Sequence, residues 1–101
     1  MTTIFEFEWD ENKARANFNK HAVSFKQGEG VFRDPLALTI YDDEQSEDED
    51  RWITIGMAAP HQYLVVVHTF AEKSPGSIHV RILSTRGADP DEIKDYQETP
   101  R

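Results

Sequence analysis

Hydrophobic and polar residues alternate at the start of the chain, and this pattern predicts a half-buried strand over residues 4–9. The aromatic side chains of this strand share one face and its two glutamates share the other: Phe5, Phe7, Trp9, Glu6 and Glu8. Asp10 is a suitable N-cap, so we expect a helix from Glu11 to about Lys20. The chain therefore opens with a strand and a helix.

A second helix is indicated by Ser24 and Gln27, which have the spacing of a capping box. This helix would run from Phe25 to about Phe32. Its two glycines weaken it by about 1 kcal/mol each. The dipeptide Asp34-Pro35 ends it, because a residue before proline disfavours the helical conformation.

Four later segments are rich in β-branched and aromatic residues and predict strands over residues 36–41, 52–57, 63–70 and 78–85. Five residues separate the second of these strands from the third, which is a hairpin-length connection. Val65, Val66 and Val67 make the third of them apolar on both faces. We therefore expect that strand in the middle of the sheet.

The chain should end in a short helix that runs to about Gln97, because Asp89 suits the N-cap, Pro90 the first turn and Glu92 the N3 position. Consecutive hairpin-type connections predict an antiparallel sheet with the helices packed on one face, which is an α+β fold. With 101 residues and no repeat or linker, a single domain over residues 1–101 is expected.

Charge is unevenly distributed along the chain. The formal net charge of −8 argues against a nucleic-acid partner. However, residues 38–50 hold seven acids and no base, whereas residues 51–87 hold four Lys or Arg and a single acid. Residues 42–50 should thus form an exposed, self-repelling loop. A basic surface remains compatible with this acidic chain, since salt screens charges over ~8–10 Å.

Cysteine is absent, which excludes disulfides and thiolate metal sites. No apolar run approaches the ~18 residues that a membrane-spanning helix needs. The first residues lack the basic and apolar stretches of a signal peptide. We therefore expect a cytoplasmic protein without membrane contact and without a cofactor.

Candidate catalytic groups come from histidine and arginine, because no glycine-rich phosphate loop, HExxH or Gly-x-Ser-x-Gly motif is present. Three neighbouring expected strands carry such residues: Arg51, His68, His79, Arg81 and Arg86. RNA cleavage without a metal needs proton transfer at two oxygens and cations that stabilise the phosphorane. Histidine titrates near neutrality and arginine grips phosphate bidentately, so these residues suit that chemistry.

The candidates on the two longest strands also have structural interpretations. His68 can be a half-buried sheet residue bonded to a backbone carbonyl, and Ser84 can simply fill a small sheet position. Arg81 and Arg86 are five positions apart, so on an ideal strand they face opposite sides. Each of these arginines can instead pair with the acidic loop or tail.

The remaining candidates have similar alternatives. Arg51 follows the acidic segment and can form a local ion pair. Lys20 and His21 lie at a helix end, where cations stabilise the helix dipole. The spacing of His61, His68 and His79 fits no known ligand pattern, so no metal site is expected.

A series of short phrases occurs in order over residues 5–86: Phe7-Glu8-Trp9-Asp10, Lys20-His21-Ala22-Val23-Ser24-Phe25, Asp34-Pro35-Leu36, Arg51-Trp52-Ile53-Thr54-Ile55-Gly56, Leu64-Val65-Val66-Val67-His68-Thr69 and Arg81-Ile82-Leu83-Ser84-Thr85-Arg86. The series resembles the BrnT family of small bacterial toxins, which are similar to the RelE ribonucleases. The resemblance implies a RelE-like fold and the toxin of a type II toxin–antitoxin pair. Such a toxin would be a metal-independent RNA endonuclease that inhibits translation.

The resemblance also implies partners and roles for individual residues. The partner would be a BrnA-like ribbon–helix–helix antitoxin, the complex would bind operator DNA only through that antitoxin, and a dimer would form within the complex. RNA would be the substrate, with the ribosome as a candidate context. Arg81 and Arg86 would hold the phosphate, His68 would be the acid or base, and Tyr96 would be a supporting acid or stacking group. Four residues would contact RNA: Lys20, His21, Arg51 and Ser84.

The C-terminal helix departs from the family pattern, which is usually rich in lysine and arginine. Here the segment after Arg86 is acidic, and Lys94 and Tyr96 are retained. This change supports an alternative hypothesis from another class. The chain would be a degenerate, non-catalytic toxin homologue that serves as a protein-binding module in a transcription-autoregulating complex.

Overall fold

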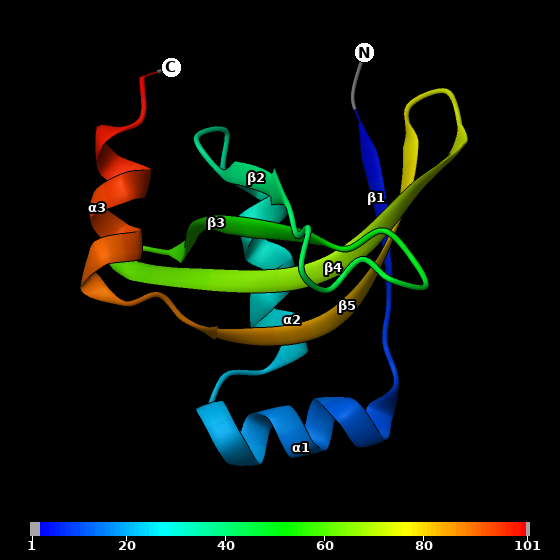
Figure 1. Ribbon diagram of the computed structural model, residues 1–101, viewed down its shortest axis with the longest axis horizontal. Coiled ribbons are helices and arrows are strands. Elements are labelled where there is room, and N and C mark those ends of the chain that lie inside the picture. Colours follow the sequence, from blue (N-terminus) through cyan, green and yellow to red (C-terminus); the bar gives the residue numbers. More distant parts are fainter. Residues whose placement is uncertain (1–2, 101) are drawn as a thin grey trace.

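The computed structural model describes residues 3–100 and has an α+β fold built on a five-stranded sheet (Figure 1). The order of elements matches the sequence prediction, with a strand, two helical segments, four strands and a final helix. In chain order they are β1 (Ile4–Glu8), α1 (Glu11–His21), α2 (Phe25–Gly28), the 3-10 helix η1 (Glu29–Arg33), β2 (Leu38–Tyr41), β3 (Trp52–Ala59), β4 (Gln62–Ser74), β5 (Ser77–Gly87) and α3 (Pro90–Glu98).

The sheet is mixed, so the prediction of a purely antiparallel sheet was wrong. The strand order is β1-β5-β4-β3-β2, and β1 pairs with β5 in parallel while the other three pairings are antiparallel. Hairpin connections fix the direction of consecutive strands only. Strand β1 is joined to the others through two helical segments, and it adds to the far side of β5 as a parallel edge strand. The central place predicted for residues 63–70 is confirmed, since β4 is the middle strand.

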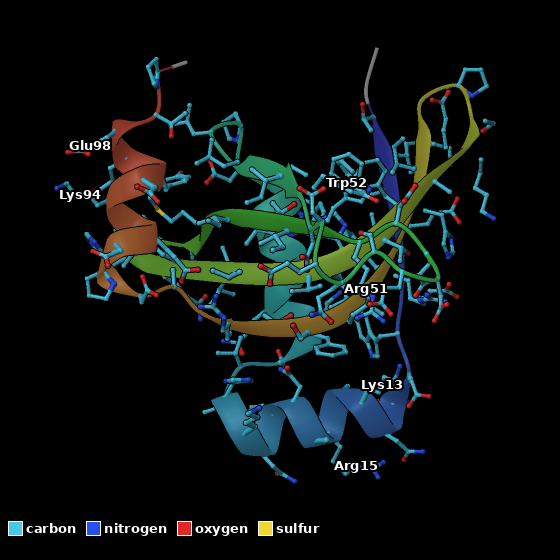
Figure 2. The ribbon with its side chains drawn as sticks, viewed as in Figure 1. Lys13, Arg15, Arg51, Trp52, Lys94 and Glu98 are labelled. Carbon is cyan, nitrogen blue, oxygen red and sulfur yellow. The ribbon has the colours of Figure 1, made fainter. Side chains whose placement is uncertain are left out.

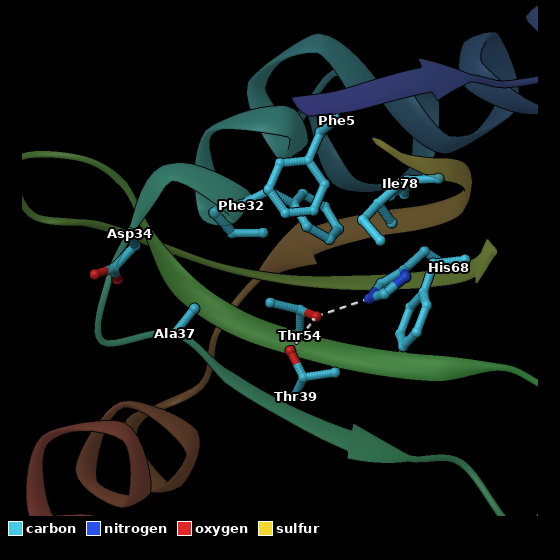
Figure 3. Close-up of a pocket in the computed structure, with 11 residues that line it drawn as sticks. Phe5, Phe32, Asp34, Ala37, Thr39, Thr54, His68 and Ile78 are labelled. Carbon is cyan, nitrogen blue, oxygen red and sulfur yellow. Dashed lines mark hydrogen bonds between the residues drawn. The ribbon is translucent and has the colours of Figure 1, made fainter. Parts of the chain in front are cut away.

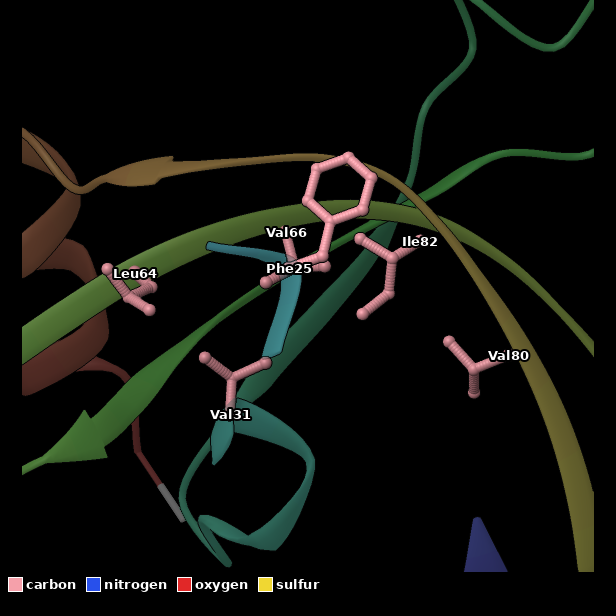
Figure 4. Packing of buried hydrophobic residues seen from close by; sticks show 6 residues of the cluster. All are labelled: Phe25, Val31, Leu64, Val66, Val80 and Ile82. Carbon is pink, nitrogen blue, oxygen red and sulfur yellow. The ribbon is translucent and has the colours of Figure 1, made fainter. Parts of the chain in front are cut away.

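One face of the sheet, which we call the helical face, is covered by α1, α2 and η1. The main core lies there and is built from six buried residues (Figure 4): Phe25, Val31, Leu64, Val66, Val80 and Ile82. Gly28 permits the close approach of α2, because a Cβ at this position would lie 2.8 Å from Thr85 Oγ1. The predicted second helix is divided into a four-residue α-helix and a 3-10 helix, and the two glycines at 28 and 30 lie at this change.

The opposite face, which we call the open face, carries a smaller core formed by Ile55, Val65 and Tyr96. Val65 and Val66 are adjacent on β4, so their side chains lie on opposite faces. Tyr96 belongs to α3, and α3 therefore packs on the open face rather than with the other helices. The prediction that all helices share one face was wrong, because the acidic C-terminal helix has its own aromatic anchor. None of the helices in residues 3–100 is both long and apolar enough to span a membrane.

Asn17 ties α1 to the sheet, and its removal should destabilise the fold. Its side chain donates to the carbonyls of Val23 and Thr85 at 3.1 and 2.8 Å and accepts from the Thr85 backbone N–H at 3.2 Å. We expect Asn17→Ala to lower the free energy of unfolding by about 2 kcal/mol, because buried backbone groups lose their partners. Chemical denaturation would measure this loss. Asn19→Ala, on the exposed side of the same helix, is the matched control, and an equal effect in both variants would contradict the proposed tether.

Candidate functional site

A β-bulge in β5 brings the two arginines of the final phrase to the same face. Arg81 pairs with Thr69 and Arg86 with Val65, and the register shifts between these two pairs. Leu83 is the extra residue of β5 at that point. Thr69 and Val65 are four positions apart on β4, so they and their partners share a face. The expectation that Arg81 and Arg86 face opposite sides was wrong, and Ser84, paired with Val67, joins them on the open face.

Arg81 is held by the acidic loop. Both carboxylate oxygens of Glu49 accept hydrogen bonds from the Arg81 guanidinium, although 40% of each side chain remains exposed. Arg81 Nε is buried and has no hydrogen-bond partner among the described residues. The loop predicted to be exposed is mostly exposed, and its Glu49 carboxylate reaches back to Arg81 of β5.

Arg51 lies beside the same loop, directly before β3 (Figure 2). It lines a hollow of about 250 Å³ whose other walls are acidic loop residues: Glu44, Gln45, Glu47, Asp48 and Glu49. Its Nε is also buried without a hydrogen-bond partner in residues 3–100. Arg51 and Arg81 are thus both in contact with the acidic loop. Arg51 precedes β3 and Arg81 lies on β5, the two strands that flank the central strand β4.

Arg86 forms an ion pair with the last helix. Its two terminal nitrogens donate to the two carboxylate oxygens of Glu92 at 2.7 and 2.8 Å. The hydrogen bond from Arg86 holds the pKa of the Glu92 carboxyl below its usual range, and the same bond raises the pKa of Arg86. The structural interpretation of both arginines, pairing with the loop or the tail, therefore describes their state in the free protein.

A further pair lies on the open face where β1 meets β5. His79 Nε2 and Glu8 Oε1 are 2.9 Å apart. The hydrogen bond with His79 lowers the pKa of Glu8, helped by the positive charges of Arg81 and Lys73. Sequence reasoning counted His79 among the candidates but could not place Glu8 beside it, because the parallel pairing of β1 with β5 has no local signal.

His68 lies on the helical face, so the sheet separates it from Arg81 and Arg86. Only 1% of its surface is exposed, and its Nε2 is 2.7 Å from Thr54 Oγ1 while its Nδ1 is 3.2 Å from the carbonyl of Thr69. Burial lowers the pKa of His68 to about 4. His68 is therefore a neutral ring with both nitrogens engaged, which agrees with its structural interpretation.

The surroundings of His68 are mainly apolar. Its ring packs edge-on against Phe32 and beside Phe70, with ring centroids 4.9 and 5.7 Å away. These residues line a cavity of about 310 Å³ on the helical face (Figure 3). A hydrogen-bonded row runs from Thr39 through Thr54 to the histidine. The cavity offers no cation to a phosphate.

The other candidate residues lie outside the cluster of arginines. Tyr96 is buried, donates its hydroxyl hydrogen bond to Asp34 and packs edge-on against Tyr63. Lys20 and His21 occupy the last turn of α1, which packs on the helical face. Across residues 3–100, no group of three or more histidines and acids is arranged to hold a metal ion.

Comparison with known proteins identifies the class of this fold. The structure is similar to the crystal structure of the Brucella abortus ribonuclease toxin BrnT, with a TM-score of 0.60 and 20% identity, and the match covers 88% of this chain and 99% of that chain. At this identity the likeness establishes the fold. No curated protein matches the sequence.

The family model described as the ribonuclease toxin BrnT of type II toxin–antitoxin systems matches residues 9–92. Because this match covers most of the chain, the chain belongs to the BrnT family. Membership implies RNA as the substrate and an antitoxin protein as the partner. The resemblance drawn from the ordered phrases is confirmed.

Proposed function

We propose that this chain is a metal-independent RNA endonuclease whose phosphate-binding site lies on the open face. The observation that carries this proposal is the shared face of Arg81, Ser84 and Arg86, which the bulge at Leu83 produces. Two guanidinium groups and a hydroxyl on one surface can grip a phosphodiester and stabilise the charge of a phosphorane. Metal independence rests on these cations, since they can supply the positive charge that a metal ion would otherwise bring.

RNA binding is expected to replace a carboxylate on the arginines by a phosphate. The carboxylates of Glu49 and Glu92 neutralise the two arginines in the free protein. An RNA phosphate would take the place of Glu49 on Arg81, because phosphate and carboxylate accept the same bidentate hydrogen bonds. Arg51 would extend the RNA surface on β3, whereas Lys20 and His21 would contact only RNA that continues along α1.

Two of the residues named by the resemblance would act through the fold. The buried ring of His68 would position β3 against β4, and the buried hydroxyl of Tyr96 would fix α3 beside Arg86 through its bond to Asp34. Both residues would then support the open face without contact with RNA. Loss of either side chain would lower RNA cleavage by displacing the arginines of the open face.

The proposed partner is a BrnA-like ribbon–helix–helix antitoxin in a cytoplasmic complex. With a net charge of −8, the chain is a poor ligand for duplex DNA, so the complex would bind operator DNA through the antitoxin. We also propose a RelE-like fold relationship, a dimer within the complex and the ribosome as a context for cleavage. These proposals rest on the family to which the chain belongs.

A second candidate function is favoured by the two ion pairs. Arg81 and Arg86 are both neutralised, and α3 carries four acids against a single lysine. A chain in which these pairs never open would bind its antitoxin and cut nothing. It would then persist as a protein-binding module in an autoregulating complex.

Expression of the chain without its antitoxin separates the two functions. Growth arrest with fragmented RNA, and cleavage by the purified protein that continues in excess EDTA, would support the metal-independent nuclease. Fragments should end in 2′,3′-cyclic phosphate, because the attacking group is the neighbouring 2′-hydroxyl. Normal growth and intact RNA from well-folded protein would instead establish the binding module.

A further inference from the structure

The open face holds, near the edge strand β1, a half-buried histidine that is oriented by a carboxylate. His79 is 27% exposed, and its Nε2 lies 2.9 Å from Glu8 Oε1. The parallel pairing of β1 with β5 sets this geometry, since it places Glu6 opposite His79 and Glu8 opposite Arg81. The pair therefore stands at the side of the arginine that would hold the phosphate.

The two ring nitrogens of His79 are in different states. Nε2 is engaged by the Glu8 carboxylate, which can only accept a hydrogen bond, so the neutral ring carries its proton on Nε2. Nδ1 has no hydrogen-bond partner within residues 3–100. Its lone pair is thus available to accept a proton. His68 differs in both respects, because its two nitrogens are engaged and its ring is buried.

The distance between His79 and Arg81 suits a phosphodiester. The two residues are two positions apart in a regular part of β5, opposite Ala71 and Thr69 of β4, and so share the open face. Their Cα atoms should be about 7 Å apart. If Arg81 held the scissile phosphate, the ribose bonded to that phosphate through O3′ would lie near His79. Its 2′-hydroxyl would then be within reach of the imidazole.

We propose that His79, oriented by Glu8, is the catalytic base for RNA cleavage at Arg81. The inference rests on the proposed nuclease function and adds the residue that moves the proton. Nδ1 takes the proton of the 2′-hydroxyl, the bond from O2′ to phosphorus forms, and the bond from phosphorus to O5′ breaks. A water molecule protonates the leaving O5′, and His79 then returns its proton to solvent. Arg81 stabilises the phosphorane while both bonds change.

The charges around His79 come from three strands. Glu6 and Glu8 project from β1, Arg81 follows on β5, and β4 offers the uncharged Ala71 with Lys73 nearby. The hydrogen bond with His79 lowers the pKa of Glu8, so the orienting carboxylate stays ionised at neutral pH. Because only the neutral ring can accept a proton, cleavage should decrease in acid, and this decrease should depend on His79.

The test uses the full-length toxin without its antitoxin and a short fluorogenic RNA. His79→Ala should lower kcat about 100-fold at pH 7, leave the Kd for RNA within about threefold, and remove the acid limb of the pH profile. Added imidazole should restore part of the cleavage by His79→Ala. Glu8→Gln should keep the fold and lower kcat by about tenfold, because the ring loses its orienting charge.

His61→Asn is the matched control, since His61 is exposed in a turn with φ of 63°, a conformation that asparagine tolerates. This variant should cleave RNA like the wild type. Unchanged cleavage and an unchanged pH profile in His79→Ala would overturn the role of His79 and leave the nuclease function standing. A wild-type chain that cleaves no RNA would overturn both.

Discussion

Arg81→Ala should lower RNA cleavage about 1,000-fold while the protein remains folded, because the main cation that meets the phosphorane is lost. The side chain is 40% exposed and its partner Glu49 lies on a surface loop, so truncation leaves no buried charge. Single-turnover cleavage of a fluorogenic RNA would measure the rate, and thermal unfolding would confirm the fold. The same change should abolish growth arrest.

Two further variants separate the effect of Arg81 from that of net charge. Arg81→Lys keeps the charge but cannot form two parallel hydrogen bonds, so its rate should lie between those of the wild type and Arg81→Ala. Arg15→Ala removes one charge from the exposed surface of α1, on the helical face. An equal loss of cleavage in Arg15→Ala, or full activity in Arg81→Ala, would place the site elsewhere.

The free energy of unfolding should decrease by about 3 kcal/mol between pH 7 and pH 4 through His68 alone. Burial lowers the pKa of this residue from 6.5 to about 4. Between these two values the unfolded chain binds a proton that the folded chain excludes, so stability decreases as the pH falls. The contribution is fully present above about pH 6.5 and is lost once the pH reaches about 4.

Urea denaturation of the wild type and of His68→Phe at several pH values would isolate this contribution. Phenylalanine keeps an aromatic ring between Phe32 and Phe70 but does not titrate. The difference between the two proteins removes the effect of the carboxylates, which also titrate in this range. Parallel stability curves for the two proteins would show that His68 is not buried in its neutral form.

Local chemistry explains what the sequence revealed about the fold. The capping boxes at Ser24 and Asp89 are both present, and Asp10 accepts hydrogen bonds from the first turn of α1 as expected. Each of these caps is defined by three or four consecutive residues, so it can be predicted from a single sequence. The run of Val65, Val66 and Val67, which is apolar on both faces, likewise identified the central strand.

The site itself depends on pairings between distant residues. Glu49 meets Arg81 across 32 positions, and β1 joins β5 across most of the chain. No periodicity predicts such contacts, because the local sequence around each residue does not specify its distant partner. The sequence therefore identified Arg81, Arg86 and His79 as candidates, but it misjudged the faces of the two arginines and could not place Glu8 beside His79.

The extra residue at Leu83 also affects how gaps in an alignment of related chains should be interpreted. Five steps of sequence between Arg81 and Arg86 occupy only four rungs of the ladder with β4. A relative that lacks one residue here could close the ladder without a bulge and still present both arginines on the same face. Elsewhere in β5 a gap of the same length would exchange the two faces of the strand. Deletion of one residue at this position can therefore preserve the fold and the faces of both arginines, whereas the same deletion a few residues away would disrupt the packing of β5.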